Sequence, residues 1–363
     1  MTYILSCSKI CFGDKMLGFM NEKKSSWEKI KESGKPVVIY GMGNGADKVI
    51  DELNRLEIPV MGVTASDGFV RGQSFRGFTV KKLSDFDGDF IVAVAFASCL
   101  PDVMNHIYSL REKYRVLVPC VPVFGDEIFN RDFICRHVNE FNAAYKLFED
   151  ESKRIFAGCV DFMFGGELEI LEMITTEKSE AFENILKLGK AESYLDLGAY
   201  RGDTVEEFLC YCGGEYSDIT ALEPDRRTFK KLEAYLENIP ESTAYQKAVY
   251  SENKTLLFSS KAGRQSAVCE KGEEIDAVCV DGLYSDKKVT YIKMDVEGAE
   301  KEAIEGARSA LKNQKPKLNI ALYHRSRDIF SIPLQLAEIN PEYKFFIRRH
   351  PYIPCWDMNL YCI

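Results

Sequence analysis

Short apolar runs alternate with segments of helical periodicity over the carboxyl-terminal half of the chain. The pattern predicts strands at 193–197, 219–222, 244–248, 289–294, 317–323, 343–349 and 359–363. It predicts helices that begin near Thr204, Asp225, Ala299 and Ile332. This alternation is typical of an α/β fold in which helices cover a mostly parallel sheet. Residues 350–355 alone join the last two strands, and such a helix-free link indicates an antiparallel pair. Two further runs, 255–259 and 277–280, predict a hairpin-like insertion.

A second alternation occupies the amino-terminal third. Its apolar runs lie at 37–40, 59–63, 90–96 and 115–118, and a helix with Val49, Ile50, Leu53 and Leu56 on one face follows the first run. Residues 124–190 instead show helical periodicity without strands. We therefore divide the chain into an amino-terminal extension (1–35), a small Rossmann-like α/β domain (36–123), a helical connector (124–190) and a larger α/β domain (191–363).

The connector carries an aromatic stripe at helical spacing, and His137 lies on it. The stripe comprises Phe133, Phe141, Tyr145 and Phe148. We expect these side chains to pack between the domains or onto a subunit of a homo-oligomer, because such stripes are more often core than cofactor sites. His137 is expected to be a paired core histidine.

The first strand of the larger domain leads into a glycine-containing loop. Asp196 lies within the strand, Gly198 and Gly202 form the turn, and Thr204 starts the helix. Such a loop lies at the carboxyl end of a parallel strand, where the backbone can approach a ligand. Glu223 follows the next strand, about 20 residues downstream, where the ribose of an adenosine cofactor needs a hydrogen-bond acceptor.

This spacing suits NAD and S-adenosylmethionine (SAM) alike, so the loop chemistry has to decide. A dinucleotide fingerprint needs closely spaced glycines to admit a pyrophosphate, whereas Gly198 and Gly202 are widely spaced. Asp196 would repel a phosphate and attract the ammonium group of a methionine moiety. The loop therefore favours SAM, and a ligand-free layer is the alternative.

A different loop follows the first strand of the small domain. Gly41, Gly43 and Ala46 match a dinucleotide fingerprint, with Asp67 where the acidic ribose ligand would fall. The candidate second nucleotide site comprises Gly41, Gly43, Asn44, Gly45, Ala46 and Asp67. Close packing of the helix on its strand explains the same glycines equally well. The sequence is compatible with both alternatives, a nucleotide site and a packing role of the glycines.

Composition narrows the function classes. The 363 residues contain 47 Lys and Arg against 56 Asp and Glu, and a net charge of −9 argues against a nucleic-acid partner. The longest apolar run, 90–100, is too short to span a bilayer. Residues 1–20 lack the core of an export signal. The 12 cysteines are scattered without a Cys-x-x-Cys pair, so we expect reduced thiols and a cytoplasmic protein.

Four motifs in order give a sharper indication. They are Leu195-Asp-Leu-Gly-Ala-Tyr-Arg-Gly-Asp-Thr204, Ala221-Leu-Glu-Pro-Asp225, Lys247-Ala-Val249 and Ile292-Lys-Met-Asp-Val-Glu-Gly-Ala-Glu300. Over about 191–363 the chain resembles the FkbM family of methyltransferases. The resemblance implies a class I methyltransferase fold, SAM as cofactor, and methylation of hydroxyls on sugars, glycans or secondary metabolites.

The resemblance also implies site residues. Asp196, Gly198, Gly202 and Thr204 would line the methionine end of SAM, and Glu223 its ribose. Lys247 and Ala248 would face the adenine, and Asp295 and Glu297 would lie near the transferred methyl group. The candidate cofactor-binding set is completed by Ala199, Pro224, Asp225 and Asp295.

The expected catalytic residues are Asp295, Glu297 and His324. Asp295 and His324 end neighbouring strands, so both should face the crevice that receives Asp196. A carboxylate or imidazole there can accept the proton of a hydroxyl acceptor. Alternatively, Asp295 caps the following helix, and Glu297 and Glu300 merely favour its positive end. His324 beside Arg325 and Arg327 could hold an acidic substrate group. A divalent metal on Asp295, Glu297 and His324 is a further alternative, but the sequence lacks a third carboxylate at a defined spacing, so no metal is predicted.

The small domain has a resemblance of its own. Ile39-Tyr-Gly-Met-Gly-Asn-Gly-Ala46 and Ser66-Asp67 resemble the small domain preceding the catalytic part of some sugar acetyltransferases, which implies a sugar-nucleotide ligand. The predicted protein is thus a SAM-dependent O-methyltransferase acting on a small molecule or glycan. The alternatives are a noncatalytic nucleotide-binding module and an NAD-dependent sugar-nucleotide oxidoreductase, for which the small domain lacks a Tyr-x-x-x-Lys pair.

Overall fold

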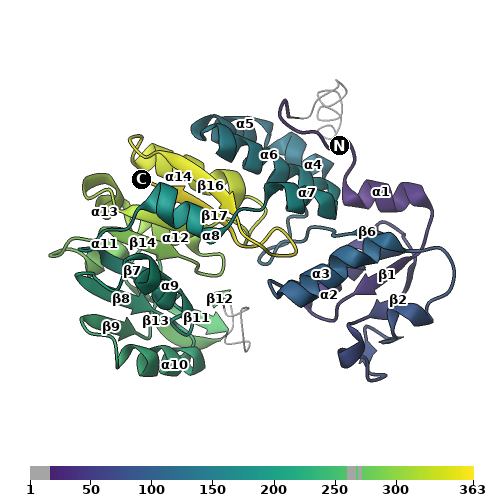
Figure 1. The fold of residues 1–363 in the computed structure, drawn as a ribbon, viewed down its shortest axis with the longest axis horizontal. Helices are drawn as coiled ribbons and strands as arrows, with labels where there is room; N and C mark the ends of the chain where they lie inside the picture. The colour runs from purple at the N-terminus through teal and green to yellow at the C-terminus, as the bar shows by residue number, and fades with distance from the viewer. Residues whose placement is uncertain (1–16, 260–266, 269–271) are drawn as a thin grey trace, which may run out of the picture. The chain divides into compact units, whose positions relative to one another are not determined.

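The computed structural model describes residues 17–259, 267–268 and 272–363 (Figure 1). The expectation about an export signal falls mainly on residues outside these ranges. The described chain forms two compact units. We call them the amino-terminal unit (17–145, 150–176 and 349–357) and the carboxyl-terminal unit (146–149, 177–348 and 358–363). Most helices of the expected connector therefore fold into the amino-terminal unit, together with residues 349–357.

A four-stranded parallel sheet is the centre of the amino-terminal unit. Its order is β2-β1-β5-β6, with β1 at Val37–Tyr40, β2 at Val60–Thr64, β5 at Ile91–Val94 and β6 at Arg115–Leu117. Helices α2 (Asn44–Arg55) and α3 (Pro101–Ser109) connect the strands, and a small hairpin, β3 (Ser74–Phe75) and β4 (Phe78–Thr79), follows β2. The apolar positions of α2 are buried on the sheet, as the periodicity predicts. The predicted parallel α/β layer is confirmed.

Helices complete this unit. They are α1 (Ser26–Ser33), α4 (Arg131–Arg136), α5 (Val138–Leu147), α6 (Asp150–Gly165) and α7 (Leu168–Ile174). The rings of Phe129, Phe133 and Phe141 pack together, with centroids 5.1 to 6.2 Å apart. Phe141 also contacts Phe156 of α6. This part of the aromatic stripe is therefore core of one unit, which corrects the expectation that it packs between domains or onto a subunit.

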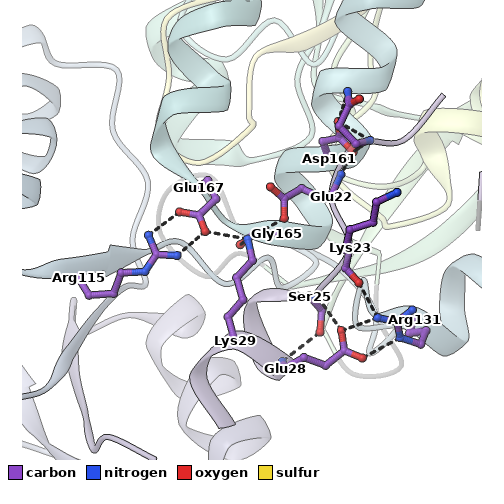
Figure 2. Close-up of polar contacts among 11 residues, drawn as sticks. Glu22, Lys23, Ser25, Glu28, Lys29, Arg115, Arg131, Asp161, Gly165 and Glu167 are labelled. Carbon is purple, nitrogen blue, oxygen red and sulfur yellow. Dashed lines mark hydrogen bonds and ion pairs between the residues drawn. The ribbon is translucent and has the colours of Figure 1, made fainter. Parts of the chain in front are cut away.

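Charged side chains attach α1 to the rest of the amino-terminal unit (Figure 2). Glu28 accepts hydrogen bonds from Arg131 at 2.7 and 3.0 Å. Lys29 donates to Glu167, which Arg115 at the start of β6 also contacts. These pairs link segments that are more than 50 residues apart in the sequence. Their partly buried carboxylates have a lowered pKa despite the opposing effect of burial.

The carboxyl-terminal unit contains a seven-stranded sheet. The order is β16-β17-β15-β14-β7-β8-β9, with bounds Phe345–Arg349, Met358–Cys362, Lys317–Ala321, Tyr291–Met294, Ser193–Leu197, Asp218–Leu222 and Ser242–Tyr245. The strands from β15 to β9 are parallel neighbours. β17 runs antiparallel to β15, and Lys344 and Ile363 exchange backbone hydrogen bonds at the start of β16. The predicted antiparallel final pair is therefore confirmed.

Helices and a small second sheet surround this layer. The helices include α9 (Asp203–Tyr211), α10 (Arg226–Leu236), α12 (Glu300–Glu305), α13 (Arg308–Asn313) and α14 (Asp328–Ile339), which starts four residues before the predicted Ile332. The second sheet has the order β10-β13-β11-β12, with bounds Ala248–Val249, Glu273–Val278, Lys254–Ser259 and Ala267–Val268. β11 and β13 form the predicted hairpin-like pair. The expected strand 244–248 is split, because its last residue joins the second sheet.

Two further sequence expectations concern membrane-spanning helices and the oxidation state of the cysteines. Within the described ranges no helix is both long and apolar enough to cross a membrane. Cys135 is disulfide-bonded, which departs from the expectation of reduced thiols, whereas the other cysteines of the described residues are free.

Candidate functional site

The candidate site lies at the carboxyl ends of four neighbouring strands of the carboxyl-terminal unit. β8, β7, β14 and β15 follow one another in the sheet, all parallel. Residues that end these strands therefore meet at one edge, where open α/β sheets bind ligands.

The glycine loop after β7 is shaped by the strands on either side. Gly198 has φ +83°, and a Cβ there would lie 1.9 Å from the backbone oxygen of Asp295. The backbone N–H groups of Gly198 and Ala199 donate to Leu222 O at 3.0 Å. Gly202 has φ +94°, and a Cβ would lie 2.4 Å from the ring of Tyr235. Both positions thus require glycine on packing grounds alone.

Asp196 is fully buried beside this loop. Its Oδ2 accepts a hydrogen bond from the hydroxyl of Thr204, the second residue of α9. Its Oδ1 has no hydrogen-bond partner of normal geometry among the described residues, although Tyr194 lies nearby. Burial raises the pKa of Asp196 to about 6, against the opposing charge of Lys293, its register partner on β14. The carboxylate is therefore under-satisfied.

Glu223 follows β8 and is tied to the glycine loop. Its Oε2 accepts the backbone N–H of Tyr200 at 3.0 Å, and its Oε1 accepts that of Asp225 at 2.8 Å. Burial raises the pKa of Glu223 to about 7, and the two N–H donors oppose this shift. The Glu223 carboxylate thus links the glycine loop to the end of β8, and both hydrogen bonds fix its orientation.

The other candidates around Glu223 have mixed roles. Asp225 caps α10, accepting from the backbone N–H groups of Arg227 and Thr228. Lys247 is half-buried between β9 and β10, and Ala248 begins β10. A cavity of about 420 Å³ opens beside them, within the usual size range of small-molecule sites. Its lining includes Pro224, Asp225, Arg226, Gln246, Thr255 and Ile275.

Asp295 comes directly after β14, and its carboxylate faces cations and hydroxyls. Lys293 Nζ lies 3.3 Å from Oδ2, and the Tyr323 hydroxyl lies 3.2 Å from both oxygens. Burial alone would raise the pKa of Asp295, but Lys293 and His324 outweigh it and lower that pKa. The cap of α12 is Ala299, and no side chain bonds the helix start. The helix-cap alternative for Asp295 is therefore wrong.

His324 is the centre of a buried acidic cluster. Its Nδ1 lies 2.7 Å from Glu300 Oε1, and its Nε2 lies 3.3 Å from Asp295 Oδ1 and 3.5 Å from Glu297 Oε2. Burial would lower the pKa of His324, yet Glu300, Asp295 and Glu297 raise it to about 10. Glu297 has φ +55°, a strained conformation for a non-glycine residue.

Sequence reasoning missed three contributors to this cluster. Glu300 is 1% exposed and accepts the backbone N–H groups of Val296 and Gly298, so it does more than favour the positive end of a helix. Lys293 and Tyr323 were not singled out either. A lysine inside the apolar strand Tyr291–Met294 was the available signal, because a buried lysine needs a carboxylate partner.

Two exposed arginines, Arg325 and Arg327, follow His324 after β15. Arg325 Nε donates to Gly298 O at 2.9 Å, and the backbone N–H of Arg325 donates to Asp328. His324 itself faces carboxylates, which disfavours the alternative that it holds an acidic substrate group.

The glycine loop of the amino-terminal unit has a packing explanation. Cβ atoms at Gly41 and Gly45 would lie 3.1 and 2.8 Å from Ala95 O, and Ala46 is fully buried. Gly43 and Asn44 are exposed, and nothing lies within 4 Å of a Cβ at Gly43. Asp67 is also exposed, 3.5 Å from Lys82. Close approach of α2 to β5 thus accounts for Gly41, Gly45 and Ala46.

Comparison with known structures defines the class of the fold. A crystal structure of methyltransferase FkbM from Methylobacillus flagellatus KT matches with a TM-score of 0.70 and 20% identity over 95% of each chain. Aeropyrum pernix fibrillarin in complex with SAM matches with a TM-score of 0.34 and 13% identity, covering 51% of this chain and 73% of that one. An rRNA methylase from Streptococcus thermophilus has a TM-score of 0.33 and 12% identity, with 48% and 87% covered. The first match establishes a methyltransferase fold.

The family comparison is more specific. Residues 196–348 match the family model of the methyltransferase FkbM domain. No curated protein sequence matches the chain significantly. The predicted family and fold class are therefore confirmed, whereas the likeness of the amino-terminal segment to sugar acetyltransferases stays a prediction.

Proposed function

We propose that the carboxyl-terminal unit binds SAM and transfers its methyl group to a hydroxyl of a saccharide or of another glycan or secondary-metabolite precursor. The family match supports methyl transfer. The hydroxyl acceptor and its saccharide nature rest on the resemblance of the sequence motifs.

The orientation of the Glu223 carboxylate is the main support for SAM as the cofactor. Both carboxylate oxygens accept backbone N–H groups, one from the glycine loop, so the remaining lone pairs can receive two ribose hydroxyls. Asp196 Oδ1, which lacks a normal partner, suits the ammonium of the methionine moiety, directly or through water. We assign the adjoining cavity of about 420 Å³ to the adenosine end of the cofactor.

The acceptor would then approach Asp295. In the reaction, an O–C bond forms as the methyl C–S bond breaks, and the sulfur keeps that bond's electron pair and becomes a neutral thioether. Alignment of the acceptor oxygen, methyl carbon and sulfur is the main demand. The hydroxyl proton passes to the Asp295 carboxylate, which accepts hydrogen bonds from Tyr323 and is 30% exposed. Although its lowered pKa makes Asp295 a weak base, an oxygen that is gaining a methyl group becomes far more acidic. His324 Nε2, 3.3 Å from Asp295 Oδ1, holds the carboxylate in place, and Glu297 lies on the same ring nitrogen.

Titration calorimetry with SAM tests the assignment on the full chain. Glu223→Ala should weaken SAM binding about tenfold or more, because it removes charge-assisted hydrogen bonds. Glu233→Ala, on the exposed side of α10, is the matched control and should bind as the wild type does. Equal affinities for the two variants would contradict the role of Glu223. Transfer of labelled methyl groups to a panel of saccharides then tests the acceptor class.

The oxidoreductase alternative has less support. Packing against Ala95 explains Gly41 and Gly45, although it does not explain Gly43. Absence of any NADH absorbance change with sugar nucleotides would agree with this.

A further inference from the structure

We propose that Asp295, Glu297 and His324 form a binding site for a divalent cation of the Mg²⁺ or Mn²⁺ class. The cation's role, to hold the acceptor hydroxyl, rests on the methyl transfer proposed above, whereas its binding does not. The sequence alone predicts no metal, because it lacks a third carboxylate at a defined spacing.

The distances from His324 Nε2 to the two carboxylates carry the proposal. His324 Nε2 lies 3.3 Å from Asp295 Oδ1 and 3.5 Å from Glu297 Oε2. Ligand bonds of about 2.1 to 2.3 Å at right angles place neighbouring ligand atoms about 3 Å apart. Each carboxylate oxygen therefore lies close to the separation from Nε2 that two ligands of one cation have. Oxygen ligands with one imidazole suit Mg²⁺ and Mn²⁺, and the imidazole favours Mn²⁺.

His324 is held in the orientation that a metal ligand needs. Glu300 Oε1 lies 2.7 Å from Nδ1, and both side chains are 1% exposed. The proton on Nδ1 stays donated to Glu300, while a cation takes the place of the proton that Nε2 otherwise carries. Metal-bound histidines commonly have such a carboxylate on the other ring nitrogen.

An independent observation is a buried carboxylate oxygen that lacks a hydrogen-bond donor in the described part of the chain. Glu300 Oε2 is buried and has no hydrogen-bond partner among the described residues. Asp328, 1% exposed, adds a fourth carboxyl near Glu300 and His324. A buried carboxylate oxygen without a donor is costly, and a nearby cation with its bound water would relieve that cost.

The site is also open on one side. The side chains of Asp295 and Glu297 are 30% and 26% exposed, so a cation can enter and keep coordination positions for water or substrate. Catalytic metal sites retain such open positions. A hydroxyl bound there becomes more acidic. With Asp295 bound to the cation, the hydroxyl proton can leave to solvent, instead of to that carboxylate, as the O–C bond forms.

Mn²⁺ binding to the full chain tests the proposal without an acceptor. After treatment with a chelator, loss of the free-ion paramagnetic resonance signal should show one bound Mn²⁺ per chain, displaced by excess Mg²⁺. Asp295→Asn and Glu297→Gln should each weaken Mn²⁺ binding about tenfold or more. Glu305→Gln, an exposed position in α12 that pairs with Arg308, should leave it within about twofold.

Circular dichroism of each variant separates loss of ligand from loss of fold, and Glu297→Gln, at a partly exposed position, keeps the test usable if another variant unfolds. Folded wild-type protein that binds no Mn²⁺ would overturn the proposal, as would equal binding by Glu297→Gln and Glu305→Gln. A parallel SAM titration keeps the two ideas distinct. SAM binding without Mn²⁺ binding would refute the cation site and leave the methyltransferase function standing.

Discussion

Lys293 Nζ lies 3.3 Å from Asp295 Oδ2, while Lys293 itself is the register partner of Asp196 on the neighbouring strand. One buried ammonium thus compensates two carboxylates, one at each end of the proposed methyl-transfer site. The lysine is 8% exposed, and these carboxylates raise its pKa although burial alone would lower it. The lysine therefore stays charged and sets the electrostatics of the site.

Removing this charge should destabilise the carboxyl-terminal unit. Lys293→Met keeps most of the side-chain volume but leaves Asp196 and Asp295 without their cation, at a cost of about 3 to 5 kcal/mol in unfolding free energy at pH 8. Urea denaturation in the presence of a chelator measures this change. The deficit should shrink at pH 5, where the carboxyls can take up protons. A deficit that is the same at both pH values would show that packing, and not charge, is lost.

The raised pKa of Glu223 makes a signed prediction about pH. Because its folded-state pKa is about 7, above the ordinary value of 4.5, the folded protein holds this proton more tightly than the unfolded chain does. Unfolding free energy therefore falls as pH rises from about 4.5 to about 7. Glu223→Gln removes this titration, so from pH 5 to pH 8 the variant should gain about 1 to 3 kcal/mol relative to the wild type. A constant difference between the two proteins would contradict the buried, protonatable carboxyl.

Glycine at position 198 should be indispensable for folding. Gly198→Ala combines a φ of +83° with a Cβ only 1.9 Å from Asp295 O, so the loop or β14 must move. We expect a loss of more than about 4 kcal/mol in unfolding free energy. Gly213→Ala is the matched control, with φ +68° and nothing within 4 Å of its Cβ. It should cost about 1 to 2 kcal/mol, the cost of the left-handed conformation alone. Similar losses in both variants would mean that the contact with Asp295 is relaxed at no cost.

Asp295→Asn separates chemistry from cofactor binding. It should reduce single-turnover methylation about 100-fold or more, whether the carboxylate accepts the proton or binds a cation, while SAM affinity changes by less than about threefold. Asp286→Asn, at an exposed position between α11 (Val280–Leu283) and β14, serves as the control and should retain full activity. Full activity of Asp295→Asn in quench-flow measurements would exclude both roles.

Local patterns were sufficient for the layers of the fold and for the loop residues of the site. Apolar period and turn glycines predicted β7, the loop at Gly198 and the position of Glu223, because each depends on neighbours close in sequence. The partners of Asp295 could not be decided locally. Whether it caps a helix or meets His324 depends on β15, which lies beside β14 only in the folded sheet.

Burial of polar residues was the weakest point of the sequence reasoning. Glu300 lies at a helix start, where an exposed acidic residue is common, and only the partner at His324 shows that it is buried. Glycines in the amino-terminal loop matched a ligand-binding pattern, yet contact with Ala95, some 50 residues away, requires two of them. In both cases the deciding atom belongs to another element of the fold.

The position of β17 in the sheet affects how the carboxyl-terminal unit folds during synthesis. β17 follows β16 in the chain but lies between β15 and β16 in the sheet. While the chain is being synthesised, the free edge of β15 therefore has no partner until residue 362 is available, and β16 has no place in the sheet. Exposed strand edges invite pairing with other chains. The nascent protein thus carries its greatest risk of misassociation just before synthesis of β17, and the two outer strands must join the sheet together.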